Sequence, residues 1–280
     1  MISVNKIFYA LSILLLCNSA AYSQDSFDEQ YNYAQSLFNE ENYFDAVTEF
    51  KRLLFFDMSE QYSFSANKMI GLSHKQGAKF SDAIRYLTLA KIQATTSIDI
   101  YNCRIEIIKI NILRRTISKA LSLLDSLSND PGFRINIDEI NYWRGWAYIF
   151  SDDWEKASQS FALIDSNHFL TTFCDSVDND LYSVTLAKVL SHIPGLGHFY
   201  TGEYLSGLLS IGWNVLWGYI TVNSFVEDRV FDGLMVGSLL WWRFYSGNLQ
   251  NAEKFALQKN LEKTNSALRF LQNNFQGERP

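Results

Sequence analysis

The four histidines are the side chains of this chain with the widest chemical use, because imidazole can bind a metal or act as a general base. They are His74, His168, His192 and His198. Only His192 and His198 are close in sequence, and their separation across a Pro-Gly turn matches no common spacing of zinc ligands. We therefore expect histidines at a surface or an interface, with no metal site.

The other patterns that support catalysis are missing. The chain contains no GxSxG, HExxH or CxxC string. Two acidic pairs, Glu40-Glu41 and Asp152-Asp153, fall at predicted turns, where carboxylates favour the start of the next helix. A glycine-rich run at residues 194–202 lacks the Lys-Ser/Thr pair and the preceding strand of a phosphate loop. We expect no catalytic residue and no cofactor.

Composition indicates an all-α protein. Hydrophobic residues make up 48% of the 280 positions, with only 3 prolines and 14 glycines, which suits long helices. The net charge of −6 argues against a nucleic-acid partner, because phosphate binding needs clustered lysine and arginine.

The N-terminus is typical of an export signal over residues 1–23. Lys6 precedes a short apolar run at residues 7–16, and Ala21 and Ser23 supply small residues before Gln24. A retained anchor is the alternative, and Leu16 argues against lipoprotein processing at Cys17. For Cys103 and Cys174, two separate buried thiols are favoured over a disulfide.

An alanine recurs at intervals of 37 residues through the first half of the chain. A large apolar residue stands three positions before each alanine, and a bulky apolar residue stands four positions after it. Pairs of short amphipathic helices bury such stripes by stacking on the next pair. The three sets are Ala46, Ala83, Ala120 and Ala157; Tyr43, Phe80, Ile117 and Trp154; and Phe50, Leu87, Leu124 and Phe161.

This pattern over residues 27–167 resembles the tetratricopeptide repeat (TPR). A small residue in the first helix, as at Gly71 and Gly145, completes the family pattern, although Ile108 takes that place in the third copy. The period of 37 exceeds the usual value near 34. The resemblance implies that a protein or peptide partner binds the array; a spacer or an oligomerisation surface is the alternative.

A second signal is a stretch without charge at residues 204–225, which is long enough to cross a bilayer. A weaker apolar segment follows at residues 230–245, with Asp232 and Arg243 near its ends. Gly233 and Gly237 would let the two helices approach closely, and Asn214 and Asn223 are expected to hydrogen-bond to the second helix. A transmembrane hairpin is predicted, and a buried hairpin of a soluble protein is the alternative.

The residues that open this region resemble a family of small two-helix bacterial membrane domains with a PGxGxxYxG string. A similar ending follows the hairpin at residues 245–248, with Ala252 and Ala256 beyond it. The resemblance implies a location in a bacterial membrane and carries no known chemistry. The matching positions are Pro194, Gly195, Gly197, Tyr200, Gly202 and Gly207.

The predicted organisation has five parts. They are a signal peptide at 1–23, four repeats at 27–167, a linker and short helix at 168–193, the PGxG motif and membrane hairpin at 194–248, and an amphipathic C-terminal helix at 249–280. Cleavage of the signal would place the repeats on the periplasmic side of the inner membrane. The lysines of the C-terminal helix favour the opposite orientation.

We expect a non-enzymatic, membrane-anchored adaptor that holds a protein partner in the cell envelope, with lipid around its hairpin. Two alternatives remain. In one, the protein is a small membrane enzyme or transport component whose hairpin is the active part and whose repeats are regulatory, with residues 194–202, Asp232 and Arg243 as the positions sensitive to substitution. In the other, it is a soluble periplasmic repeat protein whose hairpin is part of the core.

Overall fold

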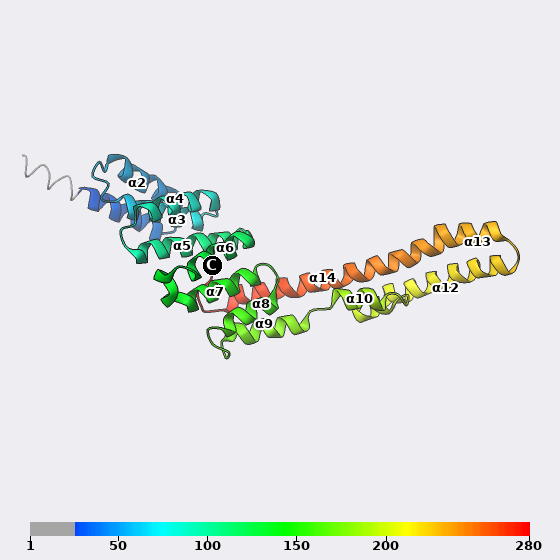
Figure 1. Cartoon of the computed structure of the whole chain (residues 1–280). Helices are drawn as coiled ribbons and strands as arrows, with labels where there is room; N and C mark the ends of the chain where they lie inside the picture. Colours follow the sequence, from blue (N-terminus) through cyan, green and yellow to red (C-terminus); the bar gives the residue numbers. More distant parts are fainter. Residues whose placement is uncertain (1–25) are drawn as a thin grey trace, which may run out of the picture. The chain divides into compact units, whose positions relative to one another are not determined.

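The computed structural model describes residues 26–280, apart from the side chains of residues 134 and 135. All regular elements within that range are helical (Figure 1). The predicted signal peptide lies outside the described residues. The chain divides into two compact units, of which Asn167–Glu278 is the second. Each unit is described by itself.

The first unit consists of four consecutive helical pairs, in which each helix packs on the next. This arrangement confirms the predicted helical-pair repeat. The first pair consists of residues 26–39 and α2 (Tyr43–Phe56), and the second pair consists of α3 (Ser63–Gln76) and α4 (Phe80–Gln93). The third pair consists of α5 (Ser97–Leu113) and α6 (Ile117–Ser128). The short 3₁₀ helix η1 (Pro131–Asn136) leads to the fourth pair, α7 (Ile137–Ile149) and α8 (Trp154–Ala162).

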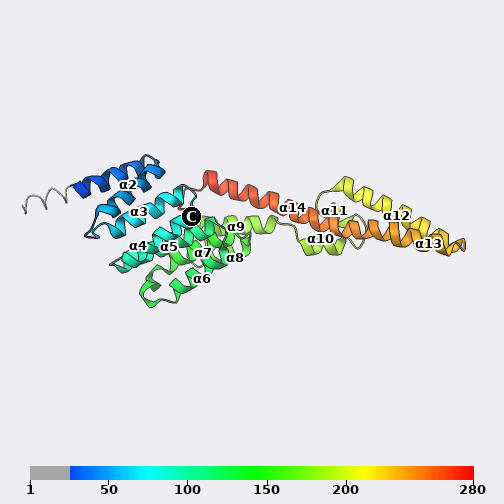
Figure 2. The ribbon, with the colours of Figure 1, turned by 90° about the horizontal axis from the view of Figure 1, so that it is seen from above.

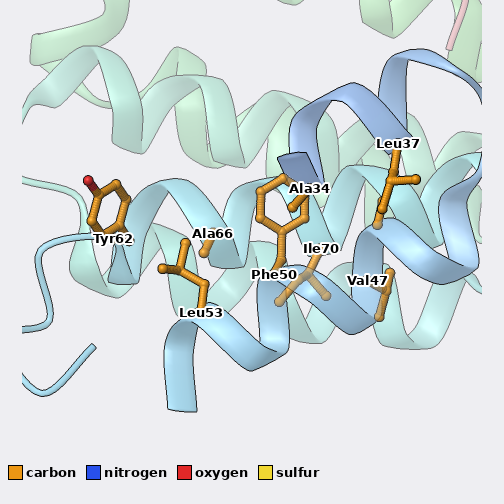
Figure 3. Close-up of a cluster of buried hydrophobic side chains, with 9 residues drawn as sticks. Ala34, Leu37, Val47, Phe50, Leu53, Tyr62, Ala66 and Ile70 are labelled. Atoms are coloured by element: carbon orange, nitrogen blue, oxygen red, sulfur yellow. The ribbon is translucent and has the colours of Figure 1, made fainter. Parts of the chain in front are cut away.

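The recurring alanines lie at the same place in every pair. Each repeated alanine lies in the first turn of the second helix and is fully buried. The bulky residue four positions later, one turn further along the same helix, is also fully buried. The alanines are Ala46, Ala83, Ala120 and Ala157. In the first pair Ala34 lies beside the ring of Phe50 (Figure 3). A Cβ on Gly145 would lie 2.5 Å from the ring of Phe161. Small residues on the first helix therefore make room for large ones on the second.

The turn inside each pair also repeats. Glu41, Ala78, Arg115 and Asp152 all have positive φ, near +60°, at the 37-residue interval. In the second pair the Lys79 amide donates to the His74 carbonyl (2.8 Å) and the Ala78 amide donates to the Lys75 carbonyl (3.0 Å). These two bonds define a Schellman motif, which usually has glycine at the left-handed position. None of the four residues is glycine, so this turn could not be read from glycine spacing.

The second unit contains a long helical hairpin and three shorter helices. Figures 1 and 2 show α12 running beside α13 and α14. A π-helical turn, labelled η2, joins α13 to α14 without breaking the helix. The elements are α9 (Phe169–Asp180), α10 (Val184–Leu190), α11 (Leu196–Tyr200), α12 (Tyr204–Val226), α13 (Val230–Val236), η2 (Gly237–Trp241) and α14 (Trp242–Asn274).

Two features of this unit differ from the sequence-based expectation. The first part of the segment expected to be a linker is the helix α9, in which Phe173 stacks on Phe270 of α14 and Phe169 stacks on Phe275, the residue just after α14. No helix boundary exists near residue 249, where the C-terminal helix was expected to begin. Gly247 lies inside α14 with helical neighbours on both sides, and no proline or left-handed residue ends the helix there.

The turn geometry gives a stability prediction for Ala78. We expect Ala78→Gly to raise the free energy of unfolding by roughly 0.5 kcal/mol, because glycine removes a steric cost of about 1–2 kcal/mol at positive φ and adds somewhat less entropy to the unfolded chain. Ala78→Val should lower it by more than about 1 kcal/mol. Chemical denaturation followed by circular dichroism measures both changes.

Ala66→Gly in α3 is the control, because glycine inside a helix costs about 1 kcal/mol. If Ala78→Gly destabilised the protein as Ala66→Gly does, the left-handed turn would be wrong.

Candidate functional site

The side chain of Asn248 on α14 joins the segments that carry the PGxG motif. Its amide nitrogen donates to the Ser191 carbonyl at 2.5 Å, and its amide oxygen accepts from the Gly195 amide at 2.9 Å. The Ser210 hydroxyl on α12 donates to the same oxygen at 2.8 Å. Asn248 is almost fully buried. One side chain thus holds the end of α10, the motif turn and α12 together.

The motif glycines permit close backbone approach around this asparagine. Gly195 has φ +87°, and a Cβ there would lie 2.7 Å from the Gly207 carbonyl oxygen. A Cβ on Gly197 would lie 2.3 Å from the Ala187 carbonyl and 2.9 Å from Ala252 Cβ. The motif therefore encodes a packing arrangement in which α11 sits directly on α10 and α14.

The other motif positions fulfil similar structural roles. Pro194 lies in the turn between α10 and α11. The Tyr200 hydroxyl accepts from the Ser183 amide at the start of α10 (2.9 Å). Gly202 has φ +80° in the turn before α12, and a Cβ on Gly207 would lie 2.5 Å from the ring of Phe199. The structure brings all six motif residues into the α10–α11–α12 region, where they shape the backbone.

Small residues line the contact between the two long helices, as the Gly233–Gly237 spacing predicts. A Cβ on Gly233 would lie 2.9 Å from the Phe225 ring, and one on Gly237 would lie 3.0 Å from Thr221 Cγ2. Gly218 faces Trp241 in the same way, since a Cβ on Gly218 would lie 3.3 Å from the indole of Trp241. The two helices therefore pack closely through glycine positions.

The burial pattern of α12 is reversed relative to the helices of the first unit. Its buried residues are Gly207, Asn214, Gly218, Thr221 and Ser224, all small or polar. Its large apolar side chains point outward, with Leu205 73% and Val215 64% exposed. In α2, by contrast, the buried residues are alanine, valine, phenylalanine and leucine. Among the described helices, α12 alone has the length and composition to cross a membrane.

The expected hydrogen bonds from Asn214 and Asn223 to the second helix are wrong. The Asn214 amide donates to the Ser210 carbonyl of its own helix at 2.8 Å, and the Asn223 amide donates to the Glu227 side chain at 3.0 Å. An asparagine can reach the carbonyl one turn earlier without any partner helix, and this local geometry competes with bonding across the hairpin.

The polar positions singled out in the second span have different surroundings. Asp232 lies 3.6 Å from Arg229 at the hairpin turn, both partly exposed. Arg243 lines a cleft of about 320 Å³ between α12 and α14, together with Trp213, Asn214 and Asn248. The structure therefore does not bring Asp232 and Arg243 together.

In the first unit, a groove of about 690 Å³ lies between the second helices of two neighbouring pairs, α4 and α6, with α5 between them. Three cationic side chains line it, from Lys91, Arg104 and Lys119, and its lining residues include no carboxylate. Arg104 also lies 3.6 Å from Asp130. The remaining lining residues are mostly aliphatic: Ile84, Ile100, Ile107 and Leu123, with Thr88, Asn111 and Ser126.

A buried charge cluster ties the first helices of successive pairs together. Lys75 on α3 lies 3.0 Å from Glu106 on α5, and Lys109 lies 2.7 Å from the same carboxylate and 4.5 Å from the Trp143 ring centroid on α7. Burial acts to raise the pKa of Glu106, but the two ammonium groups outweigh it and hold that pKa below its usual range. This cluster therefore joins α3, α5 and α7 within the array.

The histidines were expected at a surface or an interface, and two of them lie away from the protein surface, at contacts between helices. His74 and His198 are buried; His74 stacks on Tyr86, and burial lowers its pKa. Cys103 and Cys174 are buried free thiols, as predicted. Within residues 26–280, no group of three or more histidine, cysteine or acidic side chains is arranged to hold a metal.

Comparisons of the chain with protein-family models, with curated proteins and with solved structures found no match.

The hydrogen bonds of Asn248 predict how much its replacement destabilises the second unit. We expect Asn248→Leu to destabilise the second unit by about 2–5 kcal/mol, because the buried Gly195 amide and Ser191 carbonyl lose their partner and each unsatisfied group costs about 1–3 kcal/mol. Thermal unfolding and protease resistance in detergent micelles measure this loss.

Asn251→Leu is the matched control, since Asn251 lies one turn along α14 and is exposed. Equal effects of the two substitutions would contradict the central role assigned to Asn248.

Proposed function

We propose that this protein is a membrane-anchored scaffold of the TPR type, whose hairpin is embedded in a bacterial membrane and whose helical array binds a protein partner. The observation that carries the anchoring part is the reversed burial pattern of α12. Large apolar side chains face outward and small or polar side chains face the neighbouring helix.

The reversed pattern fits a lipid environment on energetic grounds. Exposing one large apolar side chain to water forgoes roughly 1.5–3 kcal/mol, and α12 exposes many, among them Leu208, Tyr219 and Val222. In lipid the same side chains carry no such penalty, and helices associate through small residues that allow close backbone contact. Gly218, Gly233 and Gly237 supply that contact.

The sequence resemblance supports a bacterial inner membrane, with the repeats in the periplasm after cleavage of the signal. Two spans return the chain to its starting side, so the array and the C-terminal part of α14 would share that compartment. The PGxG segment would lie where the chain enters the hairpin.

The array is proposed to bind an acidic, partly apolar peptide segment in the α4–α5–α6 groove. Three cations line this groove on a chain whose net charge is −6. Charge complementarity therefore favours glutamate- or aspartate-containing partners, and the isoleucines and Leu123 would contact their apolar side chains.

Anchoring is tested by lysine substitutions at two depths. We expect Val215→Lys with Val222→Lys to move a large share of the protein from the carbonate-washed membrane pellet to the supernatant, because a charge at the centre of the span costs about 2.5–3.5 kcal/mol and a second charge inside the span adds to that cost. The wild-type protein should stay in the pellet.

The matched control is Val226→Lys with Val230→Lys beside the hairpin turn, where lysine reaches water at small cost. All four valines are exposed in the structure. If the hairpin faced water, both double variants would behave alike, and wild-type protein would be released by carbonate.

Partner binding is tested with a fluorescent peptide of glutamate and leucine residues and the full-length protein in detergent. We expect Lys91→Glu with Lys119→Glu to weaken binding by about tenfold or more, equivalent to about 1.4 kcal/mol, and added salt to weaken wild-type binding. Fluorescence anisotropy gives the dissociation constants.

Lys51→Glu with Arg85→Glu makes the same charge change outside the groove and should leave binding within about twofold. A lysine–leucine peptide should bind weakly. Equal losses in the two double variants, or preference for the cationic peptide, would exclude the groove as the site.

A further inference from the structure

Helix α10 runs along α14 toward the long hairpin. At its start, Tyr182 is bonded to the Asn260 side chain through both its N–H and its carbonyl, at 2.8 and 2.9 Å. At its end, the Ser191 carbonyl accepts from Asn248. Asn248 precedes Asn260 by about 18 Å along the axis of α14. α10 is therefore antiparallel to α14 and advances along it by about that distance.

The chain then reverses at residues 191–195, the motif turn, and α11 runs back along the same helix. The Gly195 amide still meets Asn248, whereas Glu203, just before α12, lies 3.3 Å from Lys259. α10, the motif turn and α11 thus form a short hairpin, which packs beside α14 (Figure 2).

The motif turn is level with the interior of α12, and not with its start. The Ser210 hydroxyl donates to the same Asn248 side chain that holds the turn. Ser210 lies about 9 Å along the helix axis from Tyr204, the first residue of α12. When α12 spans a bilayer, the motif turn therefore lies about 9 Å beyond the level at which α12 enters it.

Charged side chains flank the short hairpin at its open end. Residues 189–202 contain no aspartate, glutamate, lysine or arginine. The flanking charges form ion pairs with α14, Lys188 with Glu253 at 2.8 Å and Glu203 with Lys259. The sequence of the hairpin thus has charge at the end nearer to water and none in the turn, as a segment inside lipid requires.

The side chains that α10 and the motif turn present outward are mostly aliphatic. Ile193, in the turn, is 63% exposed, and Leu208 is exposed at a similar level of α12. His192 is also exposed, but its imidazole can be neutral, unlike the side chains of lysine and arginine. The exposed aliphatic residues of the short hairpin are Leu186, Val189, Ile193 and Leu196.

The irregular backbone of the turn has its hydrogen bonds supplied by the protein. The N–H groups of residues 191, 192, 193 and 196 bond to carbonyls three or four positions earlier, and that of Gly195 bonds to Asn248. Pro194 has no N–H to satisfy. The His192 carbonyl accepts from the Tyr245 hydroxyl at 3.4 Å. Non-helical backbone is tolerated at membrane depth only where protein groups satisfy it in this way.

We propose that α10, the motif turn and α11 form a re-entrant hairpin, which enters the lipid layer and leaves it on the same side. Its aliphatic side chains contact lipid acyl chains just below the headgroups, at the depth typical of interfacial helices. Because the chain returns to its starting side, the number of spans stays at two. This assignment rests on the proposed membrane anchoring.

Electron paramagnetic resonance measures the depth of the turn in the full-length protein, in liposomes of phosphatidylethanolamine and phosphatidylglycerol. A nitroxide is attached at Ile193→Cys in a Cys17→Ser background, while Cys103 and Cys174 are buried and stay unlabelled. Oxygen collides mainly with labels in lipid, and a polar nickel chelate collides mainly with labels in water. We expect the label at Ile193 to favour oxygen.

Three reference labels fix the scale. Leu208→Cys should lie at the depth of Ile193→Cys to within about 3 Å, or two residues of helix. Val215→Cys, nearer the middle of α12, should lie deeper. Leu261→Cys, on α14 beyond Lys259, should favour the nickel chelate. All three side chains are exposed, and the protein without an added cysteine should take up no label.

The proposal is overturned if Ile193→Cys favours the nickel chelate as Leu261→Cys does, while Leu208→Cys and Val215→Cys favour oxygen; the anchoring would then stand without the re-entrant hairpin. Few collisions with either reagent at Ile193 would also overturn it, because a second copy or another protein would then cover the turn. Nickel collisions at Val215 as well would show that the anchoring itself fails.

Discussion

The direction in which large apolar side chains point is the constraint on which both units depend. In the array the bulky residue four positions after each repeated alanine points inward, so Phe50 and Phe161 are fully buried and the opposing helix carries Ala34 or Gly145 to make room. In α12 they point outward, and the inner face is left to glycine and short polar residues. The same steric rule, one small residue opposite one large one, thus operates in two units with opposite burial patterns.

In the second unit, buried backbone N–H and C=O groups must find hydrogen-bond partners among the unit's own residues. The motif turn places the Gly195 amide and the Ser191 carbonyl in a buried position, where water is excluded and an unpaired group is expensive. Asn248 satisfies both with one side chain and also accepts from Ser210. This role explains why the motif glycines and the residues after the hairpin belong to one arrangement, although 53 positions separate Gly195 from Asn248.

Much of the fold could be predicted from periodicity, because the 37-residue spacing fixes which residues face the next helix and a charge-free run fixes α12. The rest depended on interactions that a one-dimensional pattern does not record. The left-handed turn at Ala78 lacks the glycine that usually marks it, and α14 continues through residue 249, where a helix boundary was expected. The spacing of the histidines did not show whether His198 lies at a surface or an interface; it is buried at a helix contact because Asn248 and Phe255 pack against it.

Polar residues within the hairpin fall into two groups according to how fully they are hydrogen-bonded. Thr221 and Ser224 donate to the Trp217 and Ile220 carbonyls of their own helix, at 2.7 and 2.8 Å, so the single donor of each hydroxyl is used within the helix. Such residues reduce side-chain size at the helix contact at little energetic cost. Asn214 and His198 differ, since each keeps a buried acceptor that the described residues do not satisfy. A buried polar atom without a partner is destabilising, so Asn214 and His198 fit simple helix packing less well than Thr221 and Ser224 do.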